Sequence, residues 1–93
     1  MTLYLVLTYH WFDEIVAGRK DVEYRGVCEH WKRRIWFQRD TIRHVCFSRG
    51  YSPRKITRPV LLIDQGACPY DGFNGPYYRI HFLPLMAITE KEP

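Results

Sequence analysis

Hydrophobic residues recur along this chain in short stretches whose spacing switches between that of strands and that of helices. Residues 3–7 are rich in Leu, Val and Tyr, which predicts a buried strand. The apolar residues that follow have helical spacing: Trp11, Phe12, Ile15 and Val16. Thr8 can cap this first helix, and Gly18 supplies the residue type at which helices commonly end.

The rest of the chain continues this mixture of elements. Residues 29–39 place Trp31 and Ile35 on one side and basic residues around the others, as in a short amphipathic helix. Further strands are expected at 21–26, 42–47, 59–64 and 77–82, with a short sixth strand as an open alternative at 85–88. This order predicts an α+β fold, a small curved, barrel-like sheet of five to six strands with two short helices at its mouth.

Length and composition limit the class of protein. A chain of 93 residues forms one domain, 1–93, and 46% hydrophobic with 16% aromatic residues exceeds what a disordered segment carries. The apolar runs are too short to span a bilayer, and the N-terminus lacks the pattern of a secretion signal. Three widely spaced cysteines argue against a disulfide framework. We therefore expect a cytoplasmic protein that does not enter a membrane.

Positive charge is concentrated in the middle of the chain. Residues 19–58 hold twelve of the fourteen Lys and Arg against four acids, a net charge of +8, whereas each flank carries −2. Such a field favours polyanions, and the excess of Arg over Lys suits bidentate contact with phosphate. The same residues could also form the solvated faces of ordinary elements.

The segment 18–25, Gly-Arg-Lys-Asp-Val-Glu-Tyr-Arg, lies where the first helix gives way to the second strand. The two-residue period of a strand places Glu23 and Arg25 on one face, with Lys20 close by. We expect these three side chains to converge on one concave pocket. Lys20 could hold a phosphate or a base carbonyl or act as a base, Glu23 could accept hydrogen bonds from a base edge, and Arg25 could orient Glu23 or bind phosphate. The alternative is an exposed lysine beside a surface ion pair.

The pattern Gly18-x-Lys20-x-x-Glu23-x-Arg25 resembles the signature of the ASCH domain, a compact relative of the RNA-binding PUA domains. All four signature positions match, and the expected order of elements covers most of the chain, although only the octapeptide is specific. The resemblance implies a PUA-like fold and a cleft, lined by the three charged residues, that binds RNA or a nucleotide without a cofactor.

An enzymatic alternative follows from the same resemblance. One branch of small ASCH proteins resembles an amidohydrolase acting on acetylated cytidine, and that branch carries a threonine where this chain has Glu23. The departure puts that activity in doubt, and Asp64 is the best candidate for a further carboxylate. If the protein is an enzyme, an amidohydrolase or a nuclease, Lys20 and Glu23 would be catalytic. A binding module is favoured, and no residue favours a third alternative, a protein-interaction adaptor.

A second candidate group lies in the loop 48–55, where Gly50 and Pro53 fix a turn. Tyr51 offers a ring on which a base could stack, and three cations could hold the backbone around it: Arg49, Arg54 and Lys55. The same composition is common in surface turns. Trp31, beside three basic residues, could also stack a base, although its helical spacing from Ile35 is more typical of a core residue.

Cys28-x-His30 and His44-x-Cys46 form a mirrored pair of residue types that can bind metals. Structural zinc sites usually have Cys-x-x-Cys or longer His spacings, so we expect no metal site here. No sequence feature singles out one of the thiols as a nucleophile.

Overall fold

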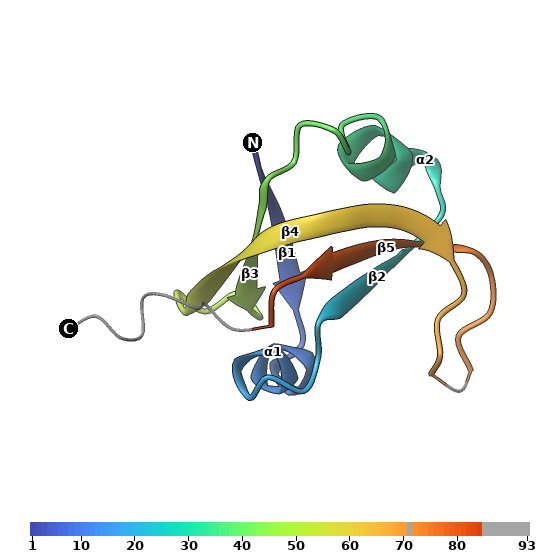
Figure 1. Cartoon of the computed structure of the whole chain (residues 1–93). Helices are drawn as coiled ribbons and strands as arrows, with labels where there is room; N and C mark the ends of the chain where they lie inside the picture. The colour runs from blue at the N-terminus through green and yellow to red at the C-terminus, as the bar shows by residue number, and fades with distance from the viewer. Residues whose placement is uncertain (71, 85–93) are drawn as a thin grey trace.

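A five-stranded mixed sheet, curved around two helical segments, organises the residues that the computed structural model describes, 1–70 and 72–84 (Figure 1). In chain order the elements are β1 (Thr2–Leu7), α1 (Tyr9–Val16), β2 (Val22–Gly26), α2 (Glu29–Trp31), the π-helical turn η1 (Lys32–Trp36), β3 (His44–Arg49), β4 (Lys55–Gly66) and β5 (Tyr77–Phe82). The α+β class and the two short helical segments are therefore confirmed. The expected strand at 85–88 lies outside the described residues.

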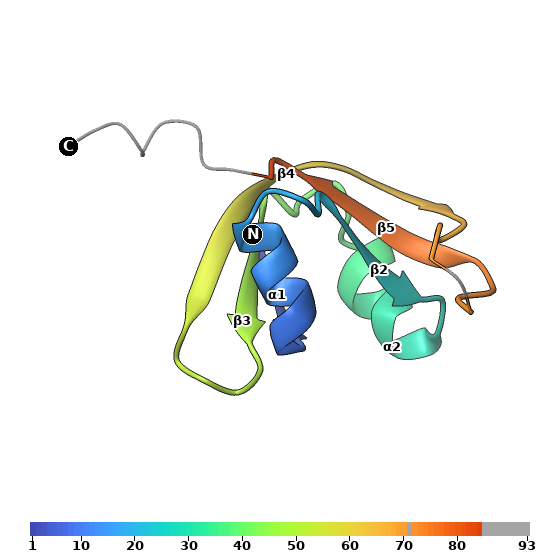
Figure 2. The same ribbon diagram turned by 90° about the horizontal axis from the view of Figure 1, so that it is seen from below.

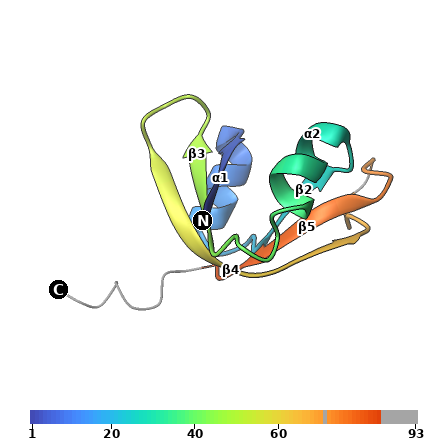
Figure 3. The same ribbon diagram turned by 90° about the horizontal axis from the view of Figure 1, so that it is seen from above.

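The sheet has the strand order β1-β3-β4-β5-β2, with β1 parallel to β3 and the other pairs antiparallel. β4 is twelve residues long and belongs to both halves, because its first part pairs with β3 and its second part with β5. A register shift between Val60 and Leu62 separates the two parts, as expected where a bulge bends a strand. The two halves of the sheet enclose α1 and α2 on their concave side (Figures 2 and 3).

Alternation along β1 and β5 builds much of the core on this concave side. In β1 the buried residues are Leu3, Leu5 and Leu7, and in β5 they are Tyr78, Ile80 and Phe82. Helix α1 adds Phe12 and Ile15, both fully buried. Because β2 pairs with β5 in a register that sets Glu23 opposite Ile80 and Arg25 opposite Tyr78, the two charged side chains of β2 face inward as well.

The end of α1 is set by Gly18, as the sequence predicts. Gly18 has a φ of 81°, its N–H donates to Ile15 O (3.0 Å), and the Arg19 N–H donates to Glu14 O (2.9 Å). These two bonds make a Schellman motif, which satisfies the last helical carbonyls and reverses the chain. Lys20 follows this reversal directly. At the other end Thr8 occupies the N-cap position but makes no side-chain capping bond, so the expected role of its hydroxyl is wrong.

The segment expected as one helix at 29–39 consists of one α-helical turn followed by a π-helical turn that ends at Trp36. The Phe37 N–H donates to Lys32 O at 2.9 Å, a bond that spans five residues. Because such a turn brings residues five apart onto one side of the helix, Trp31 and Trp36 both pack against the core. Phe37 is left outside, with 65% of its surface exposed.

The sheet is not closed into a barrel, so that part of the expectation is wrong. In the described part of the chain β1 and β2 are the two ends of the sheet, and the long side chain of Arg25 stands between them. Strand bounds also differ from those expected: β3 is His44–Arg49 instead of 42–47, and β4 is Lys55–Gly66 instead of 59–64. β1 and β2 differ from the expected bounds by one residue at their starts. No helix within residues 1–70 and 72–84 is long and apolar enough to cross a membrane.

Candidate functional site

A cavity of about 240 Å³ opens at the gap between the end of β1 and the edge strand β2. β1 and the start of α1 form one wall, β2 and Lys20, which lies two residues before it, form the second, and the connection between β4 and β5 forms the third. The lining residues are Val6, Leu7, Thr8, Trp11, Lys20, Glu23, Tyr24, Arg25, Cys68, Tyr70 and Phe73. Lys20, Glu23 and Arg25 thus converge on one cavity, as their spacing predicts.

Glu23 is the centre of the polar wall. Its Oε1 lies 3.3 Å from Lys20 Nζ, and its Oε2 lies 3.0 Å from both Nε and Nη2 of Arg25. Lys20 and Glu23 are 5% and 7% exposed, so this is not the surface ion pair of the alternative interpretation. Two cations against one carboxylate leave this wall with a formal charge of +1, which suits a ligand that carries one negative charge.

Part of the hydrogen-bonding capacity of this wall remains for a ligand. An ammonium has three donors, and among the described residues Lys20 Nζ bonds to Val22 O at 2.7 Å and lies beside Glu23. A carboxylate has about four acceptor positions, of which the two cations use only some. The wall can therefore offer both a donor and an acceptor to one planar group.

Aromatic rings surround the Lys20 ammonium on its other sides. Nζ lies 4.9 Å from the ring centroid of Trp11, 5.2 Å from that of Tyr24 and 5.5 Å from that of Tyr70. Such contacts with ring faces stabilise a cation that has lost water. Burial raises the pKa of both Tyr24 and Tyr70, so both phenols stay neutral at physiological pH. This arrangement holds the ammonium in one place without a second carboxylate.

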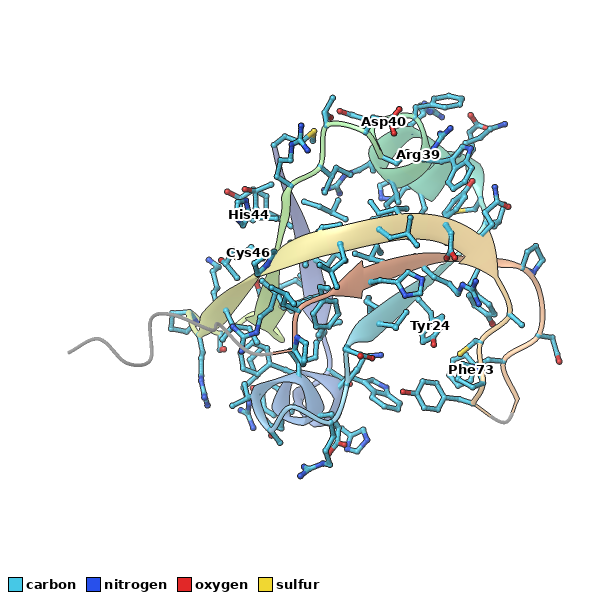
Figure 4. The ribbon with its side chains drawn as sticks, in the orientation of Figure 1. Tyr24, Arg39, Asp40, His44, Cys46 and Phe73 are labelled. Atoms are coloured by element: carbon cyan, nitrogen blue, oxygen red, sulfur yellow. The ribbon has the colours of Figure 1, made fainter. Side chains whose placement is uncertain are left out.

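Several lining residues were not identified from the sequence. Tyr70 and Phe73 lie in the connection between β4 and β5, and Figure 4 shows Phe73 on this connection near Tyr24 of β2. The Tyr70 ring is 5.0 Å from that of Trp11 and 5.9 Å from that of Tyr24. The only available signal was the presence of aromatic residues in a loop rich in Gly and Pro. Cys68 and Thr8 gave no signal of their own.

The loop group does not join this cavity. Arg49 donates two hydrogen bonds to Asp13, at 2.9 and 3.0 Å, and its guanidinium lies 4.0 Å from the Tyr9 ring. These bonds lower the pKa of Asp13. The Arg54 guanidinium lies 5.4 Å from the Phe12 ring, and Lys55 begins β4 instead of ending the loop.

Tyr51 is the remaining member of that group, and it is 96% exposed. None of the four candidate residues of the loop lines the cavity. The charge of Arg49 is compensated by Asp13, so the loop offers fewer cations to a ligand than its sequence indicates.

Asp64, the candidate for a further carboxylate, is used elsewhere. Both of its oxygens accept 2.8 Å hydrogen bonds from Arg79, and Oδ1 lies 3.0 Å from His81 Nε2. The bonds from Arg79 lower the pKa of Asp64 to about 2. Arg79 and His81 alternate with the buried residues of β5, so the cluster lies on the outer face of the sheet. Asp64 is not among the residues that line the cavity.

The mirrored Cys and His pairs do not meet in a metal-binding group. No set of three or more His, Cys, Asp or Glu side chains converges among residues 1–70 and 72–84. His44 and Cys46 project from β3 on the side away from the cavity (Figure 4), and Cys28 is exposed before α2.

Fold and site together define a small α+β domain with a cavity that is charged on one wall and aromatic on the others. Comparison with protein-family models, with curated proteins and with solved structures finds no match. The chemical character of the cavity therefore has to be inferred from its own residues.

Proposed function

We propose that this is an ASCH-like domain that binds one base or nucleotide of single-stranded RNA in the cavity beside Lys20, Glu23 and Arg25. One observation carries the proposal: a buried wall with a net charge of +1 faces aromatic rings across a single cavity. A nucleotide has the matching parts, a flat ring for the aromatic walls, donor and acceptor edges for Glu23 and Lys20, and an anionic phosphate.

The size of the cavity supports a small ligand. Pockets for drug-sized ligands are roughly 300–1,000 Å³, whereas this cavity is about 240 Å³. Such a space suits one base, and the remainder of a strand has to lie outside it. The PUA-like relationship rests on the octapeptide and on the agreement in element order.

Calorimetric titration with the four ribonucleoside 5′-monophosphates tests the proposal. We expect heat of binding for at least one of them, lost in Lys20→Met and in Glu23→Gln. Lys55→Met is the matched control, because it removes the same charge from a residue outside the cavity. Absence of binding to all four, or equal binding by Lys20→Met, would contradict a nucleotide site.

A hydrolase acting on a modified nucleoside is the second candidate. The observation in its favour is that an ammonium, a carboxylate and the Thr8 side chain line the same cavity, where Lys20 and Glu23 could activate water. We rank it below binding, because Glu23 is held by two cations and Asp64 is turned away. Purified protein should leave acetylated cytidine intact over hours by chromatography. Turnover that disappears in Lys20→Met would reverse this ranking.

A further inference from the structure

The outer side of residues 29–39 carries cations that are paired with rings instead of carboxylates. Their charged groups lie 4.1–5.6 Å from ring centroids: Lys32 from Phe37, Arg34 from Trp31 and Arg39 from Trp36. Within residues 1–70 and 72–84, none of these three makes an ion pair, whereas Arg33 has a long contact of 3.7 Å with Glu29. All three are exposed, and Figure 4 shows Arg39 on the outside of this segment.

One ring of this surface is free to take a ligand. Trp36 is stacked on Tyr78, with 5.5 Å between centroids and 17° between planes, and Arg39 lies against it. Phe37 is 65% exposed, and Lys32 Nζ lies 5.6 Å from the centroid of its ring. The π-helical turn is the reason, because it directs Trp31 and Trp36 to the core and leaves Phe37 facing solvent.

This surface is continuous with the cavity through Arg25 and Trp31. Arg25 lines the cavity, and its guanidinium carbon lies 5.0 Å from the centroid of the Trp31 ring. Arg34 lies 5.6 Å from the same ring. The views from below and from above show α2 next to β2 (Figures 2 and 3). A chain of positive groups and rings therefore leads out of the cavity and onto the helical segment.

The loop 48–55 has no comparable continuity. Arg49 is compensated by Asp13, and none of the loop's cations lines the cavity. Charge complementarity to a polyanion that leaves the cavity therefore favours the helical segment over the loop.

We propose that a single-stranded nucleic acid, with one base in the cavity, continues along the outer side of residues 29–39. Lys32, Arg34 and Arg39 contact its phosphates, and Phe37 stacks a second base. A single strand fits better than a duplex, because only unpaired bases offer a face to an exposed ring. The inference rests on the proposed function for the position of the first base.

Fluorescence anisotropy with a fluorescein-labelled ten-nucleotide RNA, titrated at several salt concentrations, tests this path. The double variant Lys32→Ala/Arg34→Ala should reduce the log-log salt slope by about 1.4, since each lost phosphate contact contributes about 0.7. The control Arg54→Ala/Lys55→Ala removes the same charge from the loop and should leave the slope unchanged. Circular dichroism should show that both variants fold, because the replaced side chains are exposed.

The stacking part of the proposal has its own pair of variants. Phe37→Ala should weaken RNA binding by roughly 5- to 150-fold, the range for one base stacked on an aromatic ring, with the salt slope unchanged. Tyr51→Ala removes the most exposed ring of the loop, and we expect it to bind like the wild type. Equal loss in both variants, or loss in Tyr51→Ala alone, would overturn the assignment of the ring.

The outcomes separate this inference from the proposed function. Mononucleotide binding that needs Lys20, combined with an RNA slope insensitive to Lys32 and Arg34, would overturn the path and keep the cavity function. RNA binding that needs Lys32 and Arg34, with no mononucleotide binding, would keep the path and refute the cavity function. A slope reduced only by the loop variant, or binding to phosphatidylserine vesicles without binding to RNA, would overturn the path.

Discussion

The guanidinium of Arg25 on β2 donates a hydrogen bond to the carbonyl oxygen of Val6 on β1, with 3.0 Å between Nη2 and O. β1 and β2 are the two ends of the sheet, so one side chain connects strands that share no ladder in the described residues. The same guanidinium is bound to Glu23 and lies against Trp31. Arg25 therefore both supports the fold and forms the wall of the cavity.

Arg25→Ala should lower the free energy of unfolding by about 2–3 kcal/mol, because two hydrogen bonds of a charged and mostly buried group are lost. Urea denaturation measures this value. Arg33→Ala is the control, since that side chain is 66% exposed and its ion contact with Glu29 is as long as 3.7 Å; it should change stability by less than about 0.5 kcal/mol. Similar values for both variants would contradict the structural role of Arg25.

Glu23→Gln should lower the free energy of unfolding by about 3 kcal/mol, because it leaves Lys20 and Arg25 without their buried counter-charge. The exposed Glu29, whose only ion pair is the 3.7 Å contact with Arg33 in the described structure, provides the same substitution as a control. We expect Glu29→Gln to be nearly neutral in the same urea experiment. A stable Glu23→Gln variant would mean that the two cations do not need this carboxylate.

Two glycines that both pair with Tyr77 give a matched test of the ion pair between Arg79 and Asp64 on the outer face of the sheet. An added Cβ at Gly66 would overlap the guanidinium of Arg79, whereas one at Gly26 meets no atom within 4 Å. Gly66→Ala should therefore displace Arg79 from Asp64 and lower the melting temperature, and Gly26→Ala should not. Scanning calorimetry of the two variants provides the measurement, and equal melting temperatures would refute the displacement.

Asp64 should make the stability of the folded protein decrease at acidic pH. Its pKa is about 2 in the folded protein against an ordinary 3.8, because Arg79 donates hydrogen bonds to the charged form. The unfolded chain therefore takes up the proton first, so this stabilisation is complete above pH 3.8 and is lost as the pH falls towards 2. Its size is at most about 2 kcal/mol, reduced by solvent screening because the carboxylate is partly exposed.

Urea denaturation between pH 2 and pH 7 measures this contribution. Asp64→Asn should be less stable than the wild type at neutral pH, and the difference should shrink on the acid side. Asp40→Asn, at an exposed position, should keep the wild-type pH dependence. A constant difference between Asp64→Asn and the wild type across this range would contradict the linkage.

The parts of the structure that depend on local spacing could be predicted from the sequence. Period two placed Glu23 and Arg25 on one face, and Gly18 marked the end of α1, because each depends on a few neighbouring residues. The convergence of Lys20 with them follows from the Schellman reversal, which lies within the same segment.

The parts that depend on distant partners could not be predicted. Asp13 compensates Arg49 from 36 positions earlier in the chain, so the charge of the loop could not be judged locally. Tyr70 has no periodic neighbours that would direct it to the cavity. The expectation of a barrel was wrong for a similar reason. Closure of the sheet depends on how far β4 bends and on what lies between β1 and β2, the two outermost strands.

The bend of β4 determines how the cavity can respond to a ligand. β1 and α1, which form one wall, are joined to the half of the sheet before the shift at Val60 and Leu62, and β2 belongs to the half after it. The two walls can therefore move relative to each other when β4 bends at this shift. A ligand bound between the two walls would restrict this bending without touching the backbone of β4. Slower hydrogen exchange of the β4 amides near Val60 and Leu62 would then report that the cavity is occupied.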